Sequence, residues 1–288
     1  MDWILTPLTY EFMQRGLLAS LMVGVICAVV GCYVVLRSMA FMGDALAHAI
    51  LPGVAIAYLL KGDMLIGALV AAILVALGIG FLSRQGTIKE DTAIGILFAG
   101  ALALGVALIS TIKTYALDLT HILFGNVLGV SVSDLWLTAI MGLIVLTTIV
   151  LLYKEFLVIS FDPVLAATLR LPTELLRNIL LILLALTIVV SLQTVGIGLV
   201  AAMLVTPGAT AFLLTRRLPT MMVIAALIGA FSSIAGLYAS FYINVASGAV
   251  VVLIATAIFL LAFLFAPTRG IVWRARREHK EVIDLAQT

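Results

Sequence analysis

The segment from Gly43 to His48 (GDALAH) places a carboxylate and an imidazole at the start of an apolar stretch. Asp44 and His48 are four residues apart, so on a helix both side chains would lie on one face, one turn from each other. Ionisable groups in a membrane segment are costly and usually face the bundle interior or a watered cavity. A carboxylate and an imidazole suit manganese, zinc or ferrous iron better than calcium or magnesium. The spacing therefore predicts part of a transition-metal site.

Two ligands from one helix cannot complete the coordination shell of such an ion. Two copies of the chain around a two-fold axis would supply two carboxylates and two imidazoles, so the pattern also predicts a homodimer. The alternative is a structural role, in which Asp44 pairs with His48 or with Arg37 near the membrane interface. The spacing alone fits both interpretations.

Five other polar residues are weaker candidates. Asp118 and His121 could meet an incoming cation, although a solvated loop explains them as well. Three amides lie near the ends of apolar segments, where interhelical hydrogen bonds are favoured over a role in a gate: Asn126, Gln193 and Asn244.

The composition determines which elements must position these residues. The chain has 288 residues, of which 64% are hydrophobic and 10% charged, and its mean hydropathy is +1.30. That leaves too little polar surface for a water-soluble globule of this size. The apolar runs are roughly 20 residues long, which favours membrane-spanning helices over the short alternating strands of a barrel. We therefore expect an all-α, polytopic transmembrane bundle, embedded in lipid and not bound to nucleic acid.

Hydropathy predicts about nine spans, and an eight-span count stays open because the sixth and seventh nearly touch. Arg216 and Arg217, together with a basic tail, indicate which loops face the cytoplasm. This orientation places 83–92 and 154–178 inside, and 113–134 and the N-terminus outside. The predicted spans are 16–36, 42–60, 65–82, 93–112, 135–153, 179–193, 195–214, 221–242 and 249–265.

Three regions follow from this pattern. Residues 1–15 form an interfacial N-terminal segment, 16–266 form the transmembrane domain, and 267–288 form a basic cytoplasmic tail. No cleavable signal peptide is evident, so the first span is expected to direct insertion.

The outer connection contains the run ILFGNVLGV, residues 122–130. This run is too short to cross a bilayer and too apolar for open water, so it predicts a short helix over or within the bundle. Four of its side chains could form an outer gate: Leu123, Phe124, Asn126 and Leu128.

The inner connection, 154–178, is the longest on its side and the natural place for a soluble partner to dock. Asp162 followed by Pro163 is typical of an N-cap and the first residue of a helix. A second helix is expected to begin near Pro172, Thr173 and Glu174.

The sequence has no phosphate-binding loop of the type GxxxxGK[ST], no HExxH motif and no nucleophile elbow. We therefore expect a transport subunit that is not itself an enzyme and holds no permanent cofactor. If ATP drives transport, a partner subunit would bind ATP with magnesium and hydrolyse it.

Five segments, in order along the chain, are VLRSMAFMGDALAHAILPGVA, KEDTAIGILFAGALALGVALIS, LFGNVLGVS, FDPVLAATLRLP and VGIGLVAAMLVTPGATAFLL. Together they strongly resemble the metal-type ABC transporter permeases for manganese, zinc and iron chelates, which have the type II ABC importer-like fold. The likeness extends over residues 12–265. It implies a multi-pass protein of a prokaryotic cytoplasmic membrane, two paired permeases, two ATP-binding subunits and an extracytoplasmic metal-binding protein.

The resemblance also implies roles for particular positions. Asp44 and His48 match the family's ion-coordinating pair on the translocation path. Arg170 departs from the pattern, since the family usually has glycine there; it could reach an acidic residue of the ATPase or, as we favour, close the end of a helix. The matching coupling segment contains Phe161, Asp162, Pro163, Ala166, Leu169, Arg170 and Leu171.

Alternating access driven by ATP is the expected mechanism, with manganese as the first-choice ion, then zinc or iron. One alternative is a permease for an organic cargo such as a siderophore or cobalamin, against which Asp44 and His48 argue. Another is a stand-alone secondary transporter, which would normally show internal repeats. An intramembrane enzyme would need a nucleophile and base that the chain does not offer.

Overall fold

A computed structural model describes residues 6–84, 89–111 and 129–266, and within these ranges every element of regular secondary structure is a helix. Nine helical segments of this part are long and apolar enough to cross a membrane, with α3 and α4 counted together. This confirms the all-α membrane bundle and the larger span count. The helices are α2 (Glu11–Leu36), α3 (Met42–Ala49), α4 (Leu51–Leu59), α5 (Met64–Arg84), α6 (Glu90–Ser110), α8 (Val132–Leu151), α9 (Tyr153–Phe161), α10 (Pro163–Thr168), α11 (Thr173–Val195), α12 (Ile197–Leu214), α13 (Leu218–Ile243) and α14 (Ser247–Phe265).

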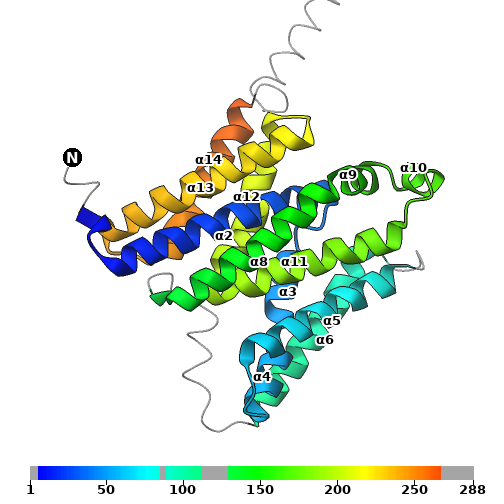
Figure 1. Cartoon of the computed structure of the whole chain (residues 1–288), viewed down its shortest axis with the longest axis horizontal. Helices are drawn as coiled ribbons and strands as arrows, with labels where there is room; N and C mark the ends of the chain where they lie inside the picture. The colour runs from blue at the N-terminus through cyan, green and yellow to red at the C-terminus, as the bar shows by residue number, and fades with distance from the viewer. Residues whose placement is uncertain (1–5, 85–88, 112–128, 267–288) are drawn as a thin grey trace, which may run out of the picture.

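Helix α2 lies at the centre of the larger group of helices, where it contacts α8, α11, α12 and α13 (Figure 1). Small residues allow the closest of these contacts. A Cβ on Gly24 would lie 2.6 Å from the Ser233 Oγ and 3.0 Å from the Gly229 carbonyl oxygen. The Ser233 hydroxyl also donates to the Ser20 carbonyl at 2.9 Å. Close backbone approach and an interhelical hydrogen bond are the usual substitutes for hydrophobic attraction between helices in lipid.

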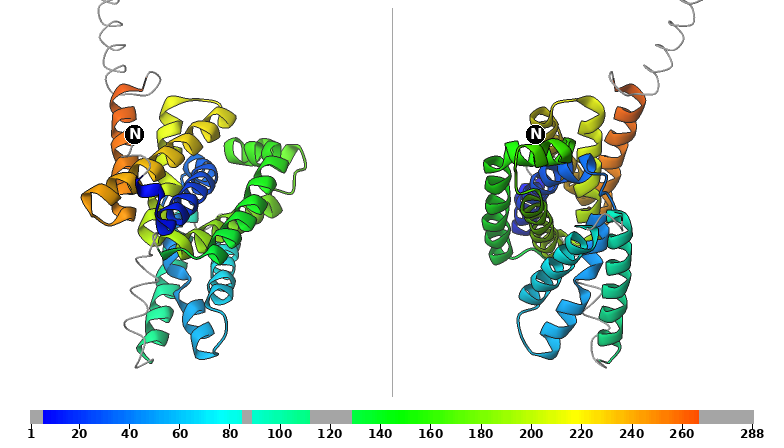
Figure 2. Two further views of the ribbon diagram at one scale, coloured as in Figure 1. Left: turned by 60° about the vertical axis from the view of Figure 1, so that its left-hand side comes forward. Right: turned by 90° about the vertical axis from the view of Figure 1, so that its right-hand side faces the viewer.

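Helices α4, α5 and α6 form a second group that projects from the first (Figure 2). Gly53 of α4 and Gly67 of α5 face each other so closely that a Cβ on either would overlap the other's main-chain carbonyl. Helix α3 lies where the two groups meet, because it contacts α5 and α6 on one side and α11 and α12 on the other. The predicted metal ligands are therefore at a junction of the bundle.

The second predicted span, 42–60, is not one continuous helix. It divides at Ile50 into α3 and α4, and Pro52 is at the second position of α4. Proline has no N–H to donate and its ring crowds the carbonyl of the fourth residue before it, here His48. The run of apolar residues hid this break from the hydropathy pattern.

Several helices begin earlier than the sequence predicted, and for two of them the structure shows a local cause. α2 starts at Glu11 instead of residue 16, so residues 11–15 of the predicted interfacial segment belong to the first span. An ion pair of 2.8 Å between Glu11 and Arg15, one turn apart, stabilises this polar first turn. α8 starts at Val132 because Ser131 and Asp134 form a capping box in front of the apolar run.

The predicted inner connection, 154–178, contains most of α9, all of α10 and the first turns of α11. The sixth and seventh spans are separate helices that nearly touch, since Gly196 alone lies between α11 and α12 and has φ 86°. The predicted outer gate residues Leu123, Phe124, Asn126 and Leu128 lie outside the described residues, as does the basic tail.

Candidate functional site

Asp44 and His48 lie on one face of α3, as their spacing predicts. The His48 Nε2 is 3.6 Å from the Asp44 Oδ1, and the two side chains are 30% and 43% exposed respectively. The other six residues of α3 are buried. The chain therefore covers α3 everywhere except along the line of its two ionisable side chains.

The alternative interpretation of Asp44, a structural pairing with His48 or with Arg37, is correct for His48 but wrong for Arg37. Arg37 does not pair with Asp44 but with Glu90, at 3.8 Å, so Asp44 has His48 as its ion-pair partner. Within the described residues, no group of three or more His, Cys, Asp or Glu side chains could hold a metal. These parts of one chain thus offer two ligands, and the two-fold completion of the site stays a prediction.

Neighbouring helices hold α3 in place. The Leu204 side chain of α12 packs on Gly43, where a Cβ would lie 2.6 Å from the Leu204 Cδ2. On the other side, the Phe98 ring of α6 is 6.1 Å from the His48 ring and 6.1 Å from the Phe41 ring, measured between centroids. The imidazole thus lies beside an aromatic ring of α6.

The helix start predicted at Asp162 and Pro163 is confirmed. The Asp162 Oδ1 accepts hydrogen bonds from the backbone N–H groups of Val164 at 3.0 Å and Leu165 at 2.9 Å, which caps α10. Ala166 is buried against the bundle, whereas a set of large apolar side chains is exposed around it. These exposed side chains are Phe161, Val164, Leu165 and Leu169.

Arg170 ends α10 through its backbone. It has φ 56°, in the left-handed region, and its N–H donates to the Ala167 carbonyl at 3.0 Å. The Leu171 N–H donates to the Ala166 carbonyl at 3.1 Å, which completes a Schellman motif. Glycine adopts this conformation at least cost, so the geometry fits the glycine that the family resemblance implies at this position.

The weaker candidates divide into three groups. The Gln193 Nε2 donates to the Asp134 Oδ1 at 3.3 Å, which confirms an interhelical hydrogen bond at that segment end. Asn244 is the C-cap of α13 with φ 57°, a conformation that asparagine tolerates well. Asp118, His121 and Asn126 lie outside the described residues.

The sequence did not predict one cluster of charged residues, at the bundle end where α2 and α5 finish and α6 and α11 begin. We call this the charged end. Besides Arg37 and Glu90, it contains an ion pair of 2.7 Å between Arg84 and Glu174. Arg177 is also there and donates to the Gly80 carbonyl. The sequence shows that these residues flank apolar segments, but only the packing shows which segment ends meet.

Comparison with known proteins gives the context of this geometry. The chain is 50% identical over 273 residues to the manganese transport system membrane protein MntC of Halalkalibacterium halodurans, covering 94% of each chain. It is 42% identical over 259 residues to the chelated iron transport system membrane protein YfeD of Yersinia pestis, covering 90% of this chain and 87% of that one. Among solved structures, PsaBC from Streptococcus pneumoniae in complex with Fab matches with a TM-score of 0.82 and 40% identity, covering 93% of this chain and 96% of the other.

A family model agrees with these similarities. The model of the ABC 3 transport family matches residues 9–266, which include every described span. An all-helical, multi-pass membrane chain with the same architecture as solved relatives is what such a match requires. The chain therefore belongs to the ABC 3 transport family.

Proposed function

We propose that this chain is the permease subunit of an ABC importer for a divalent transition metal, with manganese as its ion. The observation that carries the proposal is the pair Asp44 and His48, whose side chains lie on the only uncovered face of α3. The names of relatives support the class of cargo, since one is a manganese and another a chelated iron transport protein. Carboxylate and imidazole ligands accept manganese, zinc and iron alike, so the ligand types alone do not select the ion.

Two such chains would face each other across a two-fold axis and share one ion between their α3 helices. Each pair of ligands leaves the shell incomplete until the partner chain adds its own, which suits an ion that must bind and then leave. In this proposal an extracytoplasmic binding protein delivers the metal, and two ATP-binding subunits hydrolyse ATP with magnesium. The complex resides in a prokaryotic cytoplasmic membrane, with the charged end facing the cytoplasm.

Metal uptake tests this proposal. The chain, expressed with its transporter partners in cells lacking their own metal importers, should accumulate manganese in preference to zinc and iron. Radioisotope uptake or elemental analysis of washed cells measures the result. Accumulation of zinc or iron instead would change the proposed ion but would still support a transition-metal importer. An assembled complex that hydrolyses ATP and accumulates none of the three ions would contradict the proposal and favour an organic cargo.

Helix α10 is the proposed contact with the ATP-binding subunit. Its exposed apolar side chains and its short length suit a helix that fits into a groove of a partner. Replacing Leu165 and Leu169 with aspartate should therefore separate ATP hydrolysis from uptake, because two carboxylates would be buried at the interface without partners.

We expect uptake per ATP hydrolysed to fall by at least about tenfold in the double aspartate variant. The matched control replaces Leu165 and Leu169 with methionine, which keeps an apolar surface of similar size and should preserve coupling. ATPase rates and uptake in proteoliposomes measure both. Normal coupling in the aspartate variant would remove α10 from the contact.

A further inference from the structure

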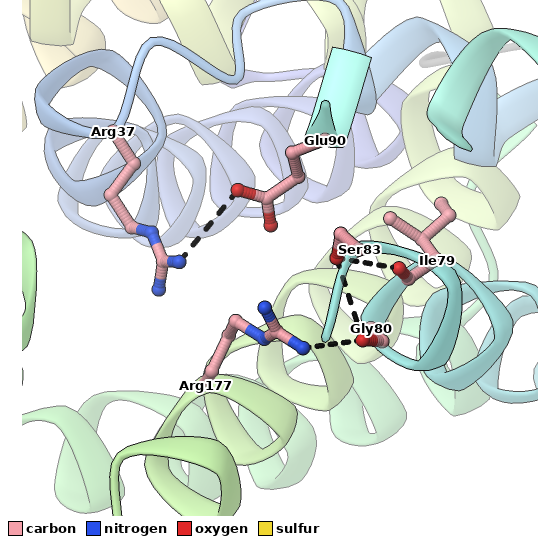
Figure 3. Close-up of polar contacts among 6 residues, drawn as sticks. All are labelled: Arg37, Ile79, Gly80, Ser83, Glu90 and Arg177. Carbon is pink, nitrogen blue, oxygen red and sulfur yellow. Dashed lines mark hydrogen bonds and ion pairs between the residues drawn. The ribbon is translucent and has the colours of Figure 1, made fainter. Parts of the chain in front are cut away.

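The charged end contains two guanidinium groups, Arg37 and Arg177, and the Glu90 carboxylate. Arg37, the C-cap of α2, is paired with Glu90, the first residue of α6. Arg177 of α11 donates to the Gly80 carbonyl of α5. Figure 3 shows the Arg37 side chain directed at the Glu90 carboxylate and the Arg177 side chain directed at the Gly80 carbonyl. Burial lowers the pKa of the Arg37 guanidinium, the Glu90 carboxylate opposes this effect, and the charge of Arg177 adds a smaller lowering.

The pairing in this conformation is incomplete. The closest approach of Arg37 Nη2 to Glu90 Oε2 is 3.8 Å, which is beyond hydrogen-bond distance. Three buried polar atoms of the cluster have no hydrogen-bond partner within the described structure: Arg37 Nη1, Glu90 Oε1 and Arg177 Nε. Buried ionic groups normally satisfy their polar atoms, because an unpaired one is expensive. The Glu90 Oε1 could accept a hydrogen bond from either arginine, whereas the two arginine atoms are both donors and cannot pair with each other.

The three side chains belong to segments that lead to the two proposed functional regions. Arg177 is in the second turn of α11, shortly after α10. Arg37 is followed by Ser38, which has φ 58°, and then by α3 with Asp44. Glu90 begins α6, whose Phe98 lies against the His48 ring. A change of the ion-pair partner of Glu90 would thus alter the positions of both α11 and α3.

We propose that Glu90 exchanges partners between two conformations of the transporter, bound to Arg37 in the one described here and to Arg177 in the other. Movement of α10 and the start of α11 brings Arg177 to the free Glu90 Oε1 and releases Arg37, which frees the entry to α3. The exchange makes these three residues a two-state element between the ATP-binding subunit and the metal ligands. The exchange requires no particular cargo, but its purpose rests on the proposed function of α10 and of Asp44 with His48.

A distance measurement on the complete transporter tests the exchange. Spin labels on Thr92→Cys and Leu175→Cys would report the separation of α6 and α11, since both positions are exposed. The native Cys27 and Cys32 are fully buried and should not react. The complex with its ATP-binding subunits, in lipid nanodiscs and diluted with unlabelled chain, is measured by double electron–electron resonance with and without ATP.

If Glu90 exchanges partners, Arg177→Gln and Arg37→Gln should shift the populations of the two conformations in opposite directions. Arg177→Gln removes one partner but keeps an amide donor for the Gly80 carbonyl, so it should raise the population of the present conformation by at least about fivefold. Arg37→Gln should raise the population of the other conformation by a similar factor. Arg37→Lys and Arg177→Lys keep the charges and should retain both populations, which separates loss of charge from misfolding.

Identical distance distributions in the wild type and both glutamine variants would overturn the exchange, and so would shifts in the same direction. The readout is independent of metal uptake. If opposite shifts occur in a complex that accumulates no metal, the proposed cargo fails and the exchange stands. If the wild type imports manganese and the shifts are absent, the exchange fails alone.

Discussion

Asp44→Ala and His48→Ala are each expected to reduce metal uptake by at least about 100-fold, while the chain still inserts and assembles with its partners. Loss of a residue that merely supports a metal ligand already costs about 10- to 100-fold in affinity, so loss of a ligand should cost more. The folding cost should be small, since both side chains are partly exposed and their mutual contact of 3.6 Å is a long one. Uptake in proteoliposomes and size-exclusion chromatography measure the two effects separately.

The matched control for Asp44 is Asp91→Ala. Asp91 is a carboxylate in the first turn of α6, on the exposed surface. Its removal changes the net charge by the same amount and should leave uptake within about twofold of the wild type, as for most surface substitutions. If Asp44→Ala or His48→Ala instead prevents insertion or assembly, the pair is a structural contact and its role as a metal site is contradicted.

Gly31→Ala is expected to have the largest effect on stability. A Cβ at this position would overlap the main-chain carbonyl of Leu204, so α2 and α12 would have to move apart. Overpacking of this kind typically costs about 1–3 kcal/mol and sometimes more. Because the Leu204 side chain also packs on Gly43, the shift should reach α3 and lower uptake as well. Thermal unfolding of the purified chain in detergent measures the loss of stability.

Two alanine substitutions provide graded controls for Gly31. At Gly43 the added methyl group meets only the end of the flexible Leu204 side chain, which can rotate away, so the loss should be smaller. At Gly100 nothing lies within 4 Å of the added Cβ, so Gly100→Ala should match or slightly exceed the wild type, since alanine favours the helix. An unchanged melting temperature in Gly31→Ala would show that α2 and α12 do not pack as closely as described.

Much of this fold was predictable because lipid imposes a simple rule on the backbone. Each span must be a helix of about 20 apolar residues, so hydropathy predicted nine segments whose ends lie within a few residues of the observed ones. The errors have local causes. Helix α2 includes Glu11 because an ion pair inside the helix compensates for its polar first turn, and Pro52 divides a span whose hydropathy is uninterrupted.

The functional residues also fall into two groups, those that the sequence predicts and those that only the packing of helices reveals. The shared face of Asp44 and His48, and the cap at Asp162, depend on spacing within one helix, which a sequence shows directly. The partner of Arg37 depends on where the end of α2 lies relative to the start of α6, and the nearby Asp44 was therefore named as a candidate instead of Glu90. Contacts between distant segments need the three-dimensional arrangement, and one sequence without relatives does not supply it.

The division of the second crossing at Ile50 has a consequence for protein engineering. The half that carries Asp44 and His48 is only eight residues long, and the half beyond it is fixed to α5 by the contact of Gly53 with Gly67. Because Pro52 offers no N–H to the His48 carbonyl, the ligand-bearing half is not joined to the other half by a continuous helix. Its ligand types could be exchanged to retune the preference for an ion while the α4–α5 hairpin is left as it is.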